Sequence, residues 1–219
     1  MSEKTAAIIG TTGLIGSHLL KSLQNDDYFK SIRVLVRRPV PFNHPKINIL
    51  VIDFADETAF KAGIAGCDAV FCAVGTTNKK VKGDKAAYRK VDYDIPVNAA
   101  RYCEETSCPH FLLVSSVGAS SKGGNFYLKL KGEVEDMVKS TSISSVSIFR
   151  PSMLLGKRPE SRPMETVAQA IIKPLSFLFP SQYKPIAAED VAKAMIAACK
   201  QDKPGFYIYH FKEMKSLRD

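Results

Sequence analysis

The sequence predicts a single α/β domain, residues 1–219, built on a doubly wound parallel sheet. Three observations support this prediction. Short β-branched runs alternate with helical stretches, and a glycine turn joins the first run to the first helix. The length and a composition of 45% hydrophobic and 24% charged residues suit one globular core. Right-handed crossovers then give the strand order 3-2-1-4-5-6.

Six short runs of apolar and β-branched residues are predicted as strands. They are Ala6–Ile9, Ile32–Val36, Ile47–Ile52, Ala69–Ala73, Phe111–Ser115 and Val146–Phe149. Helical stretches lie between them, at Leu14–Leu23, Glu57–Ala65, Lys85–Cys103 and Tyr127–Lys139.

The C-terminal part of the chain begins with a change in composition at Gly156–Pro163, which predicts an exposed loop. After it we expect helices at Met164–Phe179 and Ala188–Lys200 and a short strand at Phe206–Tyr209. Residues 157–219 are too few for an independent domain. They are expected to form a small cap, integrated into the domain, over the carboxyl ends of the strands, where ligands bind in such sheets.

The apolar segment Ala168–Phe179 within this cap has several interpretations. Packing against the sheet is one, and a hydrophobic substrate wall or the face of a homodimer is another. Peripheral membrane contact is the third, although the segment lacks a clean amphipathic pattern. No run of 18 apolar residues occurs, so no membrane span is expected.

The turn after the first strand carries three glycines in the pattern G-x-x-G-x-x-G. Gly10 allows a sharp turn, Gly13 lets the backbone approach a pyrophosphate, and Gly16 lets the helix pack closely on the sheet. The helix N-terminus offers N–H groups and a positive dipole end to phosphates. The alternative is a purely structural turn. We expect a dinucleotide to contact Gly10, Thr12, Gly13, Leu14, Ile15 and Gly16.

The end of the second strand indicates which dinucleotide binds. An NAD-binding domain places an acidic residue there, on the ribose 2′-hydroxyl, whereas this chain has Arg37 and Arg38. Two guanidinium groups suit a 2′-phosphate, which favours NADP (NADPH) over NAD; an exposed basic turn is the alternative. Further cofactor contacts are expected at Asp53, Phe54, Ala73, Val74 and Gly75. Asp53 follows the third strand and could equally cap a turn.

The formal net charge is +9, and the densest basic run spans Lys79–Lys90. A solvated helix face explains it, as does a field that attracts an anionic cofactor or substrate. No nucleic-acid partner is expected, because no reader motif accompanies the lysines. Five cysteines without a C-x-x-C pair and four scattered histidines predict reduced thiols, no metal site and a cytoplasmic location.

Candidate catalytic residues lie on the helix after the fifth strand, where Tyr127 and Lys131 are four residues apart. Residues at this spacing share one helix face, so both side chains can enter one cleft. A free tyrosine has a pKa near 10, and a close ammonium favours its phenolate. Ser115 and Ser116 stand at the end of that strand. The alternative is a surface tyrosine beside a solvated lysine.

Taken together, these motifs resemble the short-chain dehydrogenase/reductase superfamily, in its atypical branch. The chain is most similar to the Tat-interacting-protein group of NADP-binding, oxidoreductase-like proteins. The matching segments are Gly10–Gly16, Val36–Arg38, Val114–Gly118, Asn125–Glu135, Phe149–Gly156 and Glu189–Ala192, in order over nearly the whole length.

The resemblance implies a role for each candidate residue. Tyr127 would exchange a proton with the substrate oxygen, and Lys131 would hold the nicotinamide ribose and tune the tyrosine. Ser116, or otherwise Ser115, would donate a hydrogen bond to the substrate carbonyl. Pro151 would pack near the nicotinamide. The implied activity is hydride transfer to or from a small-molecule carbonyl or alcohol substrate.

Two departures from the superfamily pattern keep other functions open. The asparagine of the catalytic set has no counterpart, and Asp92 lies in that helix instead. The region after the sixth strand is shorter than in sugar-nucleotide epimerases, which weakens that interpretation. A non-catalytic NADPH-binding regulator is the main alternative, because motifs alone do not prove a productive substrate pocket.

Overall fold

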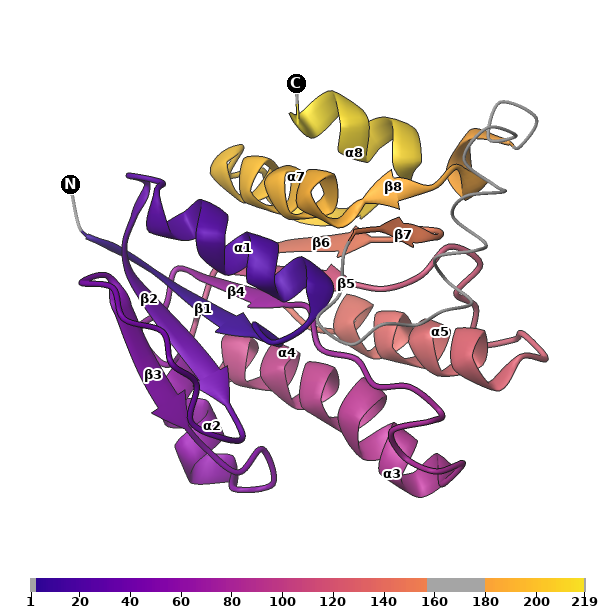
Figure 1. The fold of residues 1–219 in the computed structure, drawn as a ribbon, viewed down its shortest axis with the longest axis horizontal. Coiled ribbons are helices and arrows are strands. Elements are labelled where there is room, and N and C mark those ends of the chain that lie inside the picture. The colour runs from indigo at the N-terminus through magenta and orange to yellow at the C-terminus, as the bar shows by residue number, and fades with distance from the viewer. Residues whose placement is uncertain (1–2, 157–179, 219) are drawn as a thin grey trace.

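A seven-stranded sheet forms the centre of the computed structural model, which describes residues 3–156 and 180–218 (Figure 1). The strand order is β3-β2-β1-β4-β5-β6-β9, and all neighbouring pairs are parallel. The strands are β1 (Lys4–Ile9), β2 (Phe29–Val36), β3 (Ile47–Val51), β4 (Ala69–Cys72), β5 (His110–Val114), β6 (Ser145–Phe149) and β9 (Gly205–Tyr209). The predicted doubly wound order is therefore confirmed, and β9 extends it by one strand beside β6.

Helices cover both faces of this sheet (Figure 1). On one face lie α1 (Leu14–Gln24) and α7 (Ala188–Lys200), with α8 (Phe211–Arg218) against α7; on the other lie α2 (Glu57–Ile64), α4 (Ile95–Glu105) and α5 (Phe126–Lys139). Successive side chains of a strand point to opposite faces. Ala6 and Ile8 of β1 therefore enter one core, and Ala7 and Ile9 enter the other. This explains the uninterrupted apolar run that the sequence shows.

Within the described residues, the predicted strands and helices occur with bounds shifted by a few residues, and the helix predicted at Lys85–Cys103 is the one that is divided. This segment is helical throughout, as predicted, but it divides into α3 (Lys85–Arg89), a π-helical turn (Lys90–Asp94) and α4. Pro96 stands in the first turn of α4 and has no N–H to donate to the carbonyl of Asp92, four residues earlier. A continuous α-helix would leave that carbonyl unpaired. π-Turns inside helices are frequent at functional sites.

The C-terminal segment joins the main body rather than standing apart from it. β8 (Ile186–Ala187) pairs with β7 (Leu154–Leu155), and α7 packs beside α1. No apolar pattern in the sequence predicts α8, because Met214 is the one buried residue of the eight that form it. The predicted helix Met164–Phe179, with the apolar segment Ala168–Phe179, lies outside the described residues. The cap over the carboxyl ends therefore stays a prediction.

Candidate functional site

The glycine turn after β1 forms a close-packed cradle at the start of α1. Gly10 has φ +96°, and its carbonyl accepts a hydrogen bond from the Gly13 N–H at 2.9 Å. A β-carbon on Gly16 would lie 2.0 Å from the Gly10 carbonyl oxygen, so any side chain there would force the helix away from the turn. Gly13 caps α1 without a side-chain hydrogen bond. This backbone is therefore suited to approach by a phosphate group, as the sequence predicts.

A cavity of about 520 Å³ opens beside this cradle at the carboxyl ends of the central strands. Its lining comes from the glycine turn, the ends of β4, β5 and β6, the loop after β4, the π-turn and α5. Of the residues predicted for the site, those that line the cavity are Thr12, Gly13, Leu14, Ile15, Ala73, Val74, Gly75, Ser115, Ser116, Tyr127, Lys131 and Pro151.

Tyr127 and Lys131 lie on the same face of α5, as their spacing predicts. The Asn125 side chain caps this helix by accepting the Leu128 N–H at 3.1 Å. Tyr127 is 37% exposed, whereas Lys131 is buried and its Nζ lies 5.9 Å from the centroid of the tyrosine ring. The phenol is thus open to a ligand, and the ammonium stands behind it.

The ammonium of Lys131 is held by Asp92 of the π-turn, at 3.1 Å from its Oδ1. Burial is the largest single effect and lowers the pKa of Lys131, but the charge and hydrogen bond of Asp92, together with the smaller effect of Tyr127, more than offset it, and the pKa is raised overall. Lys131 therefore stays protonated at neutral pH, which the proposed role of this residue requires.

The two serines at the end of β5 have different surroundings. The Ser115 hydroxyl donates to the buried carboxylate of Glu135, which also binds the Arg150 guanidinium, with Arg150 Nε 3.0 Å from Glu135 Oε1. The Ser116 hydroxyl donates a long hydrogen bond, 3.4 Å, to the carbonyl of Val117. Ser116 is therefore the better donor to a ligand, in agreement with its place ahead of Ser115 in the prediction.

Gly10 and Gly16 belong to the glycine turn beside the cavity and are not among its lining residues. The other four predicted cofactor residues outside the cavity lie at the ends of β2 and β3. Arg37 and Arg38 directly follow β2 and are both exposed. Asp53 is exposed too, and its Oδ1 accepts the Ala55 N–H at 2.9 Å, which is the turn-capping contact. Phe54 packs edge-on against Phe60, with ring centroids 4.8 Å apart. The cofactor roles of these four residues stay predictions.

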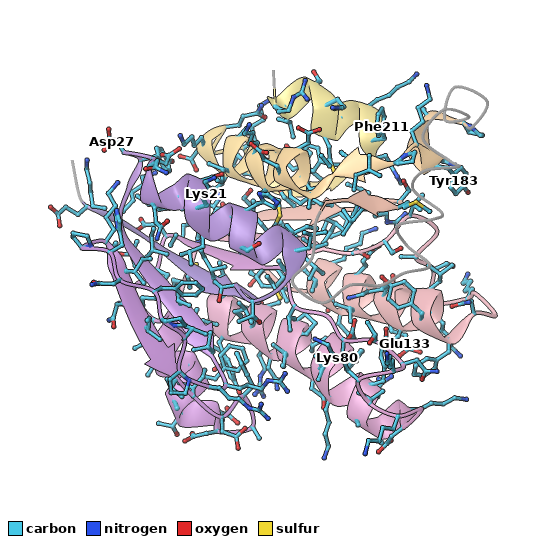
Figure 2. The ribbon with its side chains drawn as sticks, in the orientation of Figure 1. Lys21, Asp27, Lys80, Glu133, Tyr183 and Phe211 are labelled. Atoms are coloured by element: carbon cyan, nitrogen blue, oxygen red, sulfur yellow. The ribbon has the colours of Figure 1, made fainter. Side chains whose placement is uncertain are left out.

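Several residues that line the cavity were not among the site residues predicted from the sequence. They lie mainly on the loop after β4 and in the helix that follows, and comprise Thr76, Thr77, Asn78, Lys80, Tyr88, Asp92, Ser152 and Leu154. Lys80 belongs to the basic run and is labelled in Figure 2. The signal for this loop was its position, because it follows Gly75 at the carboxyl end of a central strand.

The fold and the glycine cradle define a Rossmann-type, NAD(P)-binding protein. Residues 10–202 match the family of proteins described as NAD(P)H-binding. The chain belongs to this family.

Two curated relatives cover most of the chain. Protein HTATIP2 of Rattus norvegicus is 33% identical over 199 residues, which are 90% of this chain and 81% of that protein. The mitochondrial protein FMP52 of Candida albicans is 32% identical over 195 residues, 86% of this chain and 85% of that one. The predicted resemblance to an oxidoreductase-like group is thereby confirmed at the level of the family.

Solved structures confirm the fold. A UDP-N-acetylglucosamine 4-epimerase from Methanobrevibacter ruminantium superposes with a TM-score of 0.73 at 18% identity, covering 96% of this chain and 77% of that one. An oxidoreductase from Lactococcus lactis superposes with a TM-score of 0.66 at 20% identity, covering 97% of this chain and 95% of that one. At these identities the likeness concerns the fold alone.

The predicted cytoplasmic location is contradicted by the relatives. The FMP52 proteins of Candida albicans, Debaryomyces hansenii and other fungi are named mitochondrial, at 28–34% identity to this chain. Composition and cysteine usage do not separate a mitochondrial from a cytoplasmic protein, which is why the prediction from the sequence was wrong. In residues 3–156 and 180–218, no helix has the length and apolar character that crossing a membrane requires.

Proposed function

We propose that this protein is an NADP-dependent oxidoreductase that interconverts a carbonyl and an alcohol, with Tyr127 and Lys131 as catalytic residues. One observation carries the proposal: Tyr127, Lys131 and Ser116 converge with the glycine cradle on a single cavity. Family membership supports binding of a nicotinamide dinucleotide in that cavity.

The chemistry divides between the ligand and the side chains. A bound dinucleotide supplies or accepts the hydride. Tyr127 exchanges the proton at its Oη with the substrate oxygen, and Ser116 donates a hydrogen bond to that oxygen. Lys131 would hold the nicotinamide ribose of a bound dinucleotide. Its positive charge behind the phenol favours the charged form of the tyrosine during the proton transfer.

Arg37 and Arg38 are proposed to select NADP over NAD. In the wild type we expect at least about tenfold tighter binding of NADPH than of NADH, which corresponds to about 1.4 kcal/mol. In an Arg37→Ala/Arg38→Ala variant we expect the ratio to fall below about threefold, because the contacts to the 2′-phosphate are lost while those to the rest of the ligand remain. Equilibrium titrations that follow nicotinamide fluorescence measure both ratios.

Arg101→Ala is the matched control, because Arg101 is an exposed arginine of α4 that pairs with Glu57 and Glu105. It should leave the ratio unchanged. Equal affinity of the wild type for NADPH and NADH would overturn the choice of NADP. Failure of the folded protein to bind either dinucleotide would overturn the oxidoreductase altogether.

The mitochondrial names of the FMP52 relatives support a mitochondrial location for this protein as well. Cell fractionation of a tagged full-length chain tests this. Recovery of the protein with the matrix, inner or outer membrane markers is expected, and exclusive recovery with cytosolic markers would contradict it.

A further inference from the structure

Asp92 occupies an unusual position for a carboxylate, because it is buried in the wall of the cavity. It is 1% exposed and lies in the π-turn between α3 and α4. Its Oδ1 is 3.1 Å from Nζ of Lys131, and its Oδ2 accepts the backbone N–H of Thr76 at 2.7 Å. One side chain thus joins α5 to the loop that follows β4.

Two donors converge on Asp92, and this explains why a carboxylate suits the position. Both oxygens of an ionised aspartate accept hydrogen bonds, whereas an asparagine presents one oxygen and one NH₂ group. An asparagine could satisfy either Lys131 or Thr76, and its NH₂ would then face the other donor. The aspartate that replaces the asparagine of the superfamily pattern is therefore matched to this arrangement of donors.

The charge of Lys131 also depends on this residue. An ammonium removed from water loses its hydration and tends to become neutral unless an opposite charge lies close. In the described part of the chain, the titratable groups that face Lys131 are Asp92 on the π-turn, Tyr127 on α5 and Cys72 on β4. Burial raises the pKa of the Cys72 thiol to about 12, so Cys72 contributes no negative charge at neutral pH.

We propose that Asp92 is a positioning residue of this site, which keeps the buried Lys131 charged and ties it to the backbone of the loop after β4. The loop and the preceding residues Ala73–Gly75 line the same cavity, so Asp92 fixes the lysine relative to the backbone that a ligand contacts. The effect on dinucleotide binding rests on the proposed function. The effect on the charge of Lys131 does not.

The titration of Lys131 tests the proposal without any ligand. In protein with isotope-labelled lysine side chains, the Lys131 signal is assigned by its loss in Lys131→Arg. In the wild type we expect Lys131 to remain charged over the whole alkaline range in which the protein stays folded. In Asp92→Asn we expect its pKa to fall at least about one unit below the 10.4 of a free lysine, because burial, the largest effect, is then opposed only by the weaker effects of the remaining neighbours such as Tyr127.

Two further variants separate the charge of Asp92 from its shape. Asp94→Asn changes an exposed carboxylate two residues away in the same π-turn and should leave the Lys131 titration unchanged. Asp92→Glu restores a carboxylate. In this variant Lys131 should stay charged up to a higher pH than it does in Asp92→Asn. An identical Lys131 titration in the wild type and Asp92→Asn would overturn the proposal.

Stability provides a second test, which applies even where Asp92→Asn folds poorly. Removing one partner of a buried pair leaves the other charge uncompensated, so a second change that removes it should be compensating. We expect Asp92→Asn/Lys131→Met to recover at least half of the urea midpoint that Asp92→Asn loses. A double variant no more stable than Asp92→Asn would contradict the role of Asp92 as the counter-ion.

Dinucleotide titrations complete the series and keep the two proposals distinguishable. Asp92→Asn should weaken NADPH binding at least about tenfold at pH 9, where its lysine is partly neutral, and less at pH 7. If the ratio of the NADPH affinities of the wild type and Asp92→Asn is the same at pH 7 and pH 9, Asp92 acts on the fold alone. Absence of NADPH binding in the wild type would overturn the proposed function and leave the result of the lysine titration standing.

Discussion

Replacement of Tyr127 by phenylalanine is expected to lower kcat about 1000-fold while leaving the affinity for NADPH within about twofold of the wild type. Phenylalanine keeps the ring on α5 and removes only the hydroxyl that would exchange a proton with the substrate. Tyr127 is partly exposed at the cavity and is not part of the core, so the fold should tolerate the change. NADPH oxidation with a carbonyl substrate found by screening the wild type measures kcat.

Tyr88→Phe is the matched control, because Tyr88 lines the same cavity but is buried and directs its hydroxyl at the carbonyl of Thr76, 3.4 Å away. We expect it to lose less than about tenfold in kcat. A Tyr127→Phe enzyme that retains nearly its full rate would disprove the proton-transfer role of Tyr127. Equal losses in the two variants would show that the cavity needs its phenols for shape, and not for chemistry.

The sequence was sufficient for the fold because its central strands carry the signals of a parallel sheet. Every residue of β4 and β6 is buried, as are the last four residues of β1, and these stretches consist of apolar or small residues without a break. Elements without such a signal could not be predicted. α8 buries Met214 alone, and β7 and β8 have two residues each, too short for any periodicity.

The site was predictable where local geometry determines it. The glycine turn and the pair Tyr127 and Lys131 depend on spacing along one turn or one helix, and the structure brings them to one cavity. The contacts of Asp92 and Glu135 could not be predicted from the sequence, because each residue joins segments that are distant along the chain. Asp92 and Lys131 come close in space because α5 packs on the π-turn. No periodic pattern in the sequence predicts that packing.

A buried network around Glu135 supports the strand ends that carry the candidate catalytic residues. Glu135, on α5, accepts hydrogen bonds from Ser115 at the end of β5 and from Arg150 at the end of β6. Arg150 precedes Pro151, whose carbonyl accepts the Val117 N–H at 3.0 Å. The carboxylate thus joins the three elements that hold Ser116, Tyr127 and Pro151 around the cavity.

Glu135→Ala is expected to lower the free energy of unfolding by about 3 kcal/mol, because it leaves the largely buried guanidinium of Arg150 without its carboxylate. Glu133→Ala is the matched control on the same helix. Glu133, labelled in Figure 2, pairs with Arg89 at 2.7 Å, but both side chains are substantially exposed. Such a surface pair contributes less than about 1 kcal/mol.

Urea unfolding followed by circular dichroism compares the two variants directly, and NADPH titration of each folded protein reports on the cavity. If the Glu135 network positions the strand ends, Glu135→Ala should also weaken NADPH binding. Glu133→Ala should leave NADPH binding unchanged. Losses of similar size in both variants would contradict the distinction between a buried and an exposed carboxylate on α5. If Glu135→Ala instead loses stability but keeps its NADPH affinity, the role of Glu135 is only to hold α5 on the sheet. Ser115 and Pro151 would then remain in position without it.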